Sequence, residues 1–371
     1  MSKRTIESFY KTVSPPSKKI KPEEEPIPTT FTTHPSYPHP IANLPSSIAN
    51  SLAKINGESN PPKKINNKPH LDLLYFHPLI PAPTARDLFN FLRRELPFYR
   101  VQYNIRRGGI NTQINTPRFT TVFGVDATSK FIIPEAPNDD GDDDDAAASP
   151  AIKPKPNDNK PNTDTDTTTS LVPIVLVDPK TNLPTPPTKY QYTPRPIPPC
   201  LDILRQAVER SIADGSSYNF CLVNYYASGD DSISYHSDDE RFLGRNPCIA
   251  SISLGAQRDF LMKHKPSDSA SGVGASVGGG PPVKFALAGG DMVVMRGETQ
   301  ANWLHSVPKR KGGEAHKGRI NITFRKAVVP GGTNNYYNYN VGSGVVYRWE
   351  EGMGKMCPVV KEEGGEEEQE K

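Results

Sequence analysis

The chain is poor in the features that mark several protein classes. Its 371 residues include four cysteines, and no two of them form a Cys-x-x-Cys pair. This scarcity excludes a disulfide scaffold or a zinc ribbon and is typical of a cytosolic or nuclear protein with reduced thiols. No apolar run reaches about eighteen residues, so we expect no membrane-spanning helix. The charged start MSKRTIESFY does not resemble a secretory signal, and we expect no export.

Apolar residues are scarce as well, whereas proline is abundant. Only 35% of the residues are hydrophobic and 39 are proline, which excludes one compact globule of this length. Low-complexity composition predicts disordered tails at 1–70 and 331–371 and an acidic disordered insertion at 136–170. The expected folded domain is 71–330 without that insertion. Its two parts, 71–135 and 171–330, hold 27 Lys and Arg against 19 Asp and Glu, which favours an anionic partner such as nucleic acid.

The apolar patterns predict a mainly β domain with flanking helices. In ARDLFNFLRREL, one helical face carries Leu88, Phe91, Leu92 and Leu96. The runs VQYNI and FTTVFGV, on either side of a glycine pair at 108–109, predict a hairpin. A second helix, CLDILRQAVERSI, precedes a series of short strands from FCLVNYY to INITFRK. Short strands separated by turn residues indicate a β-sandwich or barrel.

The stretch NYYASGDDSISYHSDDE contains a histidine and a carboxylate at a spacing that suits metal binding. His236 and Asp238 lie two apart on a predicted strand, so their side chains leave the same face. His305, in NWLHSVP, could add a third ligand from a neighbouring strand. Two histidines and one carboxylate with open positions form the facial triad of non-haem Fe(II) oxygenases. The alternative is that these histidines are structural, as a single histidine on a strand usually is.

The strand RINITFR favours the metal interpretation. Arg319 and Arg325 lie six apart, so both side chains face one side, together with Asn321 and Thr323. Two guanidinium groups inside a barrel need anions, because a buried unpaired charge is costly. A dicarboxylate co-substrate would supply one partner, and acidic side chains near the metal would supply another. Inward arginines without any ligand are the alternative.

Together these segments resemble the AlkB family of Fe(II)/2-oxoglutarate-dependent dioxygenases, and within it the eukaryotic, fungal-like homologues that repair alkylated DNA. The resemblance rests on NYYASGDDSISYHSDDE, PCIASISLGAQRDFLMKHK, NWLHSVP and RINITFRK, in that order. Upstream, TPRFTTVFG and YTPRPIPPCLDIL resemble the family's nucleotide-recognition region. The resemblance covers about residues 71–135 and 171–328. The resemblance implies a double-stranded β-helix, or jelly-roll, core.

The resemblance also implies cofactors and a reaction. Fe(II) would be bound by His236, Asp238 and His305, with 2-oxoglutarate and O₂ as co-substrates. The implied 2-oxoglutarate pocket is lined by Arg319, on the distal carboxylate, and by Asn224, Tyr226, Asn321, Thr323 and Arg325. The implied reaction is oxidative demethylation of bases of the 1-methyladenine or 3-methylcytosine type in DNA, with release of succinate, CO₂ and formaldehyde. The same chemistry on RNA, or a catalytically silent clamp-tethered DNA-binding module, are the alternatives.

The substrate of such an enzyme dictates further expectations. A methyl group on the Watson–Crick edge is reached only when the base is flipped out or single-stranded. A cationic methylated base favours aromatic faces and carboxylates. We therefore expect stacking on Tyr190 or Tyr192, with Phe123 in reserve, and hydrogen bonds from the exocyclic amine to Asp239 or Glu240. Basic residues, among them Arg118, Lys309 and Lys311, would meet the phosphates.

The N-terminal segment predicts a protein partner. Ile6, Phe9 and Tyr10 have the spacing of a peptide that binds the sliding clamp PCNA, although Lys3 stands where such peptides usually have Gln. PSKKIKP is a short basic cluster compatible with nuclear import. We therefore expect a nuclear monomer that binds DNA, and through this peptide PCNA, and has no contact with a membrane.

Overall fold

Eight strands in the second half of the chain build the centre of the molecule. A computed structural model describes residues 30–133, 174–266 and 281–359. One antiparallel sheet contains, in spatial order, β11 (Phe220–Tyr226), β18 (Arg319–Arg325), β13 (Ile249–Gly255) and β16 (Met292–Met295). A second contains β12 (Ile233–His236), β17 (Trp303–Val307), β14 (Arg258–His264) and β15 (Val283–Leu287). The chain passes back and forth between them, which is the jelly-roll order and confirms the predicted fold class.

The first sheet continues on both sides to a total of ten strands. Beyond β11 it adds β8 (Phe119–Gly124), β5 (Phe98–Tyr99), β19 (Val346–Glu350) and β20 (Lys355–Pro358). Beyond β16 it adds β4 (Leu73–Phe76) and β3 (Lys63–Ile65). Segments from both ends of the described chain therefore extend one sheet.

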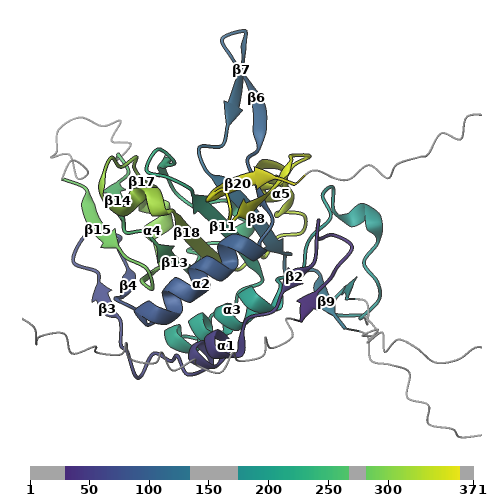
Figure 1. Cartoon of the computed structure of the whole chain (residues 1–371), viewed down its shortest axis with the longest axis horizontal. Coiled ribbons are helices and arrows are strands. Elements are labelled where there is room, and N and C mark those ends of the chain that lie inside the picture. Colours follow the sequence, from purple (N-terminus) through teal and green to yellow (C-terminus); the bar gives the residue numbers. More distant parts are fainter. Residues whose placement is uncertain (1–29, 134–173, 267–280, 360–371) are drawn as a thin grey trace, which may run out of the picture.

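Helices lie across this large sheet (Figure 1). They are α2 (Ala82–Glu95) and α3 (Pro199–Ile212), and α1 (Ser46–Ala53) packs against these two helices. In α2, Leu88, Phe91 and Leu92 are buried as their helical spacing predicts, and they share one apolar cluster with Ile252 of β13 and Ile320 of β18. This packing holds β13 and β18, and β18 carries Arg319 and Arg325. None of the helices in the described part of the chain is long and apolar enough to cross a membrane.

A hairpin projects from the body of the molecule (Figure 1). It is formed by β6 (Gln102–Arg107) and β7 (Ile110–Asn115). Gly108 and Gly109 adopt φ values of +56° and +85°, which a two-residue turn of this kind requires. The predicted hairpin had the right turn but the wrong second strand, because FTTVFGV forms β8 of the large sheet. The polar run INTQIN gave too weak a strand signal to be recognised.

Ordered elements lie on the outer side of both predicted domain boundaries, at 70 and 331. Before residue 71 the structure contains β1 (Phe31–Thr32), β2 (Ile41–Ala42), α1 and β3. Ile48 and Leu52 of α1 are buried in the main core, so this segment belongs to the fold. After residue 330, α5 (Asn334–Asn340), β19 and β20 do so as well. The predicted insertion 136–170 lies outside the described residues, as do the ends of both predicted tails.

Smaller elements connect these parts. Strands β9 (Lys130–Ile132) and β10 (Val175–Val177) pair with each other, and α4 (Thr299–Asn302) leads into β17. Three short 3₁₀ turns complete the described elements: η1 (Pro187–Lys189), η2 (Arg241–Leu243) and η3 (Gly313–Lys317). All four cysteines, Cys200, Cys221, Cys248 and Cys357, are free thiols, as predicted.

Candidate metal centre and substrate cavity

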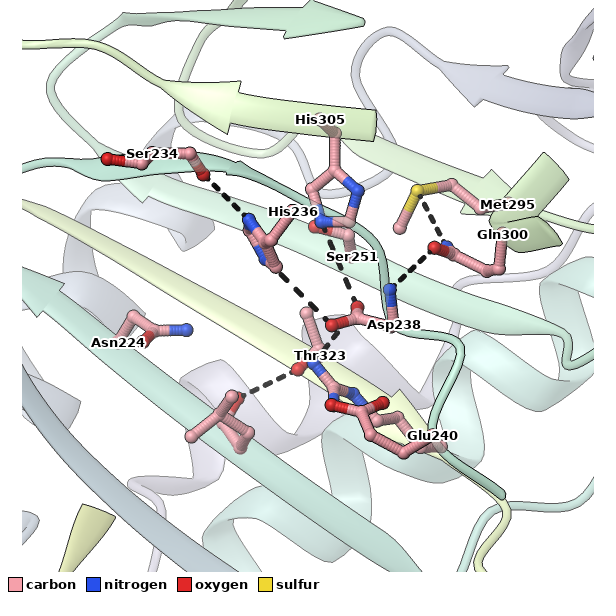
Figure 2. A network of polar contacts seen from close by, with 12 residues as sticks. Asn224, Ser234, His236, Asp238, Glu240, Ser251, Met295, Gln300, His305 and Thr323 are labelled. Atoms are coloured by element: carbon pink, nitrogen blue, oxygen red, sulfur yellow. Dashed lines mark hydrogen bonds and ion pairs between the residues drawn. The ribbon is translucent and has the colours of Figure 1, made fainter. Parts of the chain in front are cut away.

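The pairing of β12 with β17 brings two histidines together. His236 lies directly opposite His305 in the ladder, and the centres of their rings are 4.2 Å apart. Asp238 does not lie on the strand as predicted, because β12 ends at His236. The loop that follows still directs the Asp238 carboxylate back to the histidines, since its backbone N–H donates to Gln300 Oε1 at 2.9 Å. Figure 2 shows the three side chains pointing toward one another.

These three side chains are prepared to bind a cation. One nitrogen or oxygen from each of His236, Asp238 and His305 lies within 4.8 Å of those of the other two. His236 Nδ1–H donates to the Ser234 carbonyl at 2.9 Å, which leaves Nε2 free to accept (Figure 2). Burial, and then the neighbouring His236, lower the pKa of His305 to about 3, so this imidazole is neutral and can bind a metal.

Asp238 is held as a carboxylate although it is only 3% exposed. Burial alone would raise its pKa, but Arg325, His305 and His236 outweigh burial and lower it. Arg325 Nη2 donates to Asp238 Oδ2 at 3.0 Å, and both side chains are buried. The paired charges therefore stabilise each other, and the carboxylate remains ionised beside the two histidines.

A cavity of about 620 Å³ opens beside the three residues. Its walls come from both sheets and include seven residues that the sequence predicted for cofactor or substrate: Arg118, Asn224, Tyr226, Glu240, Asn321, Thr323 and Arg325. Arg118, directly before β8, donates from Nε to Asn224 Oδ1 of β11 at 2.6 Å, at the cavity wall. The volume lies in the range of small-molecule sites.

Arg319 lies behind this wall and is not itself among the cavity residues. It is 1% exposed, and its guanidinium carbon is 5.4 Å from the centre of the Tyr226 ring. Nη2 donates to Ser253 Oγ at 2.7 Å, whereas Nε and Nη1 have no hydrogen-bond partner among the described residues. Burial lowers its pKa to about 10, so Arg319 is still a cation at neutral pH. A buried cation with two unused donor nitrogens fits a carboxylate ligand.

Four predicted substrate residues lie away from the cavity. Phe123 is fully buried in the core, and Tyr190 is buried with its hydroxyl donating to Ser129 Oγ at 3.1 Å. Tyr192 donates to Asn338 Oδ1 at 2.8 Å, and Asp239 pairs with Lys265 at 2.8 Å. Of the expected substrate contacts, only Glu240 and Arg118 line the cavity, so the predicted stacking residues require correction.

Helix α5 supplies the aromatic side chains that the sequence analysis missed. It contributes four cavity residues, which we call the α5 wall: Asn335, Tyr336, Tyr339 and Asn340. The only sequence sign was the tyrosine-rich run NNYYNYN, which shows no apolar period. Gln300 was missed too; its Oε1 accepts from Asp238 N, while its Nε2 contacts Met295 Sδ at 3.2 Å (Figure 2).

The chain was compared with known proteins. Residues 175–325 match the family model of the 2OG-Fe(II) oxygenase superfamily. The chain is 39% identical over 151 residues to the DNA oxidative demethylase ALKBH2 of Arabidopsis thaliana, which covers 38% of this chain and 46% of that protein. The chain is 42% identical over 127 residues to the alpha-ketoglutarate-dependent dioxygenase alkB homolog 3 of Bos taurus, which covers 34% of this chain and 42% of that protein. The chain is 39% identical over 137 residues to human DNA oxidative demethylase ALKBH2, which covers 37% of this chain and 49% of that protein.

The jelly roll, the His-Asp-His cluster and the family match define this part of the chain as a 2OG-Fe(II) oxygenase domain. Within that superfamily the chain is similar to AlkB-family proteins over part of its length, in agreement with the resemblance seen in the sequence. The family implies Fe(II), 2-oxoglutarate and O₂ as cofactor and co-substrates. The chain spans about half the length of the curated relatives it matches.

Proposed function

We propose that this protein is a DNA repair dioxygenase that removes N-methyl groups from damaged bases. One observation carries the proposal: His236, Asp238 and His305 meet beside a cavity, with Arg319 and Arg325 on strand β18 of the other sheet. In this role the three residues would hold Fe(II), and open coordination positions would remain for small ligands. When bound, Fe(II) and 2-oxoglutarate supply an oxidation by O₂ that converts the methyl group to formaldehyde and yields succinate and CO₂.

The protein's own residues would bind and orient the co-substrate. Arg319 would donate Nε and Nη1, which are unused among the described residues, to the distal carboxylate of 2-oxoglutarate. Asn224 and Tyr226 line the adjoining wall and would complete this pocket. Arg325 would keep Asp238 ionised and in place through the 3.0 Å pair. Asn321 and Thr323, between the two arginines, would line the same pocket.

The cavity also suits a single extruded base. A base methylated on its Watson–Crick edge must leave the duplex or come from a single strand before it can be demethylated. A base methylated in this way carries a positive charge, which favours carboxylate and aromatic neighbours. Glu240 would accept from the exocyclic amine, and Tyr336 and Tyr339 replace Tyr190 and Tyr192 as candidates for the aromatic contact. Arg118 would contribute charge at the same wall.

The test is formaldehyde release from matched single- and double-stranded oligonucleotides, with DNA and RNA versions that carry 1-methyladenine or 3-methylcytosine. Release that requires Fe(II) and 2-oxoglutarate and is larger for DNA supports the proposal. Larger release from RNA would assign the same chemistry to RNA. Binding to DNA without any release from any oligonucleotide would instead indicate a catalytically silent binding module.

A tether to the sliding clamp and a nuclear location form a separate part of the proposal. Ile6, Phe9 and Tyr10 lie outside the described residues, so the argument for PCNA binding rests on their spacing. We propose that the full chain, as a monomer, binds PCNA through them. Replacement of Phe9 and Tyr10 by alanine should abolish co-purification with PCNA and leave formaldehyde release from free oligonucleotides unchanged. Retained co-purification would refute this tether.

A further inference from the structure

Helix α5 lies beyond the family match, which ends at residue 325, yet it forms a wall of the cavity. The helix is anchored on the large sheet by hydrogen bonds on its other side. Tyr337 OH donates to the Gly124 carbonyl at 2.8 Å, and Thr120 Oγ1 donates to the Asn340 carbonyl at 2.9 Å. Both anchors are buried on β8 or at its end, so the position of α5 against the cavity is firmly set.

One residue of α5 connects the metal side of the cavity to the substrate side. The Tyr336 hydroxyl accepts a hydrogen bond from Arg325 Nη1 and donates to Glu240 Oε1 at 2.6 Å. Arg325 in turn donates to Asp238 Oδ2 at 3.0 Å. A continuous chain of charge-assisted hydrogen bonds therefore runs from Asp238 through Arg325 and Tyr336 to Glu240.

The hydroxyl has a role that no other side chain fills in the described part of the molecule. It donates a hydrogen bond to Glu240 Oε1, whereas Glu240 Oε2 has no hydrogen-bond partner among the described residues. One carboxylate oxygen is thus held, and the other is left for a donor. The ring of Tyr336 is held edge-on by Phe220 at 5.5 Å and Phe242 at 5.3 Å between ring centres, so the hydroxyl has little freedom to move.

We propose that Tyr336 is a positioning residue that sets the Glu240 carboxylate for recognition of the exocyclic amine of a methylated base. The inference rests on the proposed function and extends it to a segment outside the family match. Tyr336 acts through Glu240 and does not itself take part in the chemistry. A phenylalanine at this position would keep the ring contacts but could neither accept from Arg325 nor donate to Glu240. Glu240 would then lose its fixed orientation.

The experiment measures the ratio of Kd values for an unmodified single-stranded DNA oligonucleotide and for the same oligonucleotide with one 1-methyladenine. The full chain is loaded with Fe(II) and 2-oxoglutarate without oxygen, so that binding is read without turnover. Tyr336→Phe should lower this preference for the methylated oligonucleotide about tenfold, because a hydrogen bond to a charged group is lost. Glu240→Gln should lower it comparably, and the double variant should be little worse than either single variant.

Tyr337→Phe is the matched control, since Tyr337 lies next to Tyr336 on α5 but points to the sheet and not to the cavity. Because the hydrogen bond from Thr120 Oγ1 to the Asn340 carbonyl still anchors α5, this variant should lower the unfolding midpoint and leave the preference unchanged. An unchanged preference in Tyr336→Phe, or fully additive losses in the double variant, would overturn the inference while the proposed function stands. A wild-type protein that shows no preference and releases no formaldehyde would overturn both.

Discussion

Two walls of the same cavity are built in different ways. The metal wall, formed by His236, Asp238, His305 and Arg325, is carried by the strands of the jelly roll and the loop after β12. Backbone ladders set its geometry, and its charges compensate one another inside the protein. The α5 wall is a short helix held by side-chain hydrogen bonds to β8. The oxidation that we propose thus lies on the part that matches the family, and the recognition that we propose involves a segment beyond it.

The largest effect should follow from breaking the metal wall. His305→Ala removes one of three ligand groups, and even the loss of an outer-shell partner costs about 10- to 100-fold in metal affinity or activity. We therefore expect formaldehyde release to fall below detection and Fe(II) binding in equilibrium dialysis to weaken strongly. His316→Ala, an exposed histidine on η3, is the control and should behave as wild type. Full activity of His305→Ala would remove this residue from the metal site.

The second effect concerns the co-substrate behind that wall. Arg319→Ala should raise the 2-oxoglutarate KM about 10- to 100-fold, because hydrogen bonds to a charged group are lost. The KM for the methylated oligonucleotide should change little, since Arg319 does not line the cavity. Arg319→Lys keeps the charge but not the planar set of donors. Its 2-oxoglutarate KM should therefore lie between that of the wild type and that of Arg319→Ala. An unchanged 2-oxoglutarate KM in Arg319→Ala would refute this role.

The two walls also differ in how far the sequence alone predicts them. His236 and His305 could be grouped in advance because both lie in strand-like segments, SISYH and NWLHSVP, and because the resemblance to the AlkB family implied a shared metal site. The same period placed Asn321, Thr323 and Arg325 on one face of β18, where the structure has them in the cavity wall. Asp238 was chosen for a partly wrong reason, since it lies in a loop and not on the strand.

The α5 wall could not be predicted in this way. Its position depends on tertiary contacts with β8, and NNYYNYN has neither an apolar period nor aliphatic residues. Tyr190 and Tyr192 were chosen for their residue type and spacing, but their hydroxyls bond to Ser129 and Asn338 and not to groups in the cavity. The predicted disorder does not hold for 30–70 for a similar reason. A few buried residues, such as Ile48 and Leu52, are enough to attach this segment to the main core.

A third prediction tests whether the segment that follows α5 is part of the fold. Trp349 of β19 stacks on Arg93 of α2, with the guanidinium carbon 3.6 Å from the ring centre, and packs against the main core. Trp349→Ala should lower the free energy of unfolding by about 2 kcal/mol in urea titrations, less than for a fully buried tryptophan. Met353→Ala, in the exposed turn between β19 and β20, should change nothing measurable. Equal stability of the two variants would show that β19 contributes little to the fold.

The smallest effect should come from charges outside both walls. Lys309 and Lys311 are exposed after β17 and are among the basic residues that we expect to meet phosphates. Replacing both by alanine should weaken binding alike for methylated and unmodified DNA. The slope of log affinity against log salt should also become shallower by about one unit for each lost phosphate contact. A loss of affinity confined to methylated DNA would contradict this assignment and would indicate that these lysines recognise the lesion.

The most direct test of the account is the mass of a DNA oligonucleotide with a single 1-methyladenine after incubation with the full chain, Fe(II), 2-oxoglutarate and O₂. We predict that the oligonucleotide loses the mass of one methylene group, that one formaldehyde and one succinate appear for each repaired base, and that His305→Ala leaves the mass unchanged. An unchanged mass with the wild-type protein, under conditions where it binds Fe(II), 2-oxoglutarate and the oligonucleotide, would contradict the account.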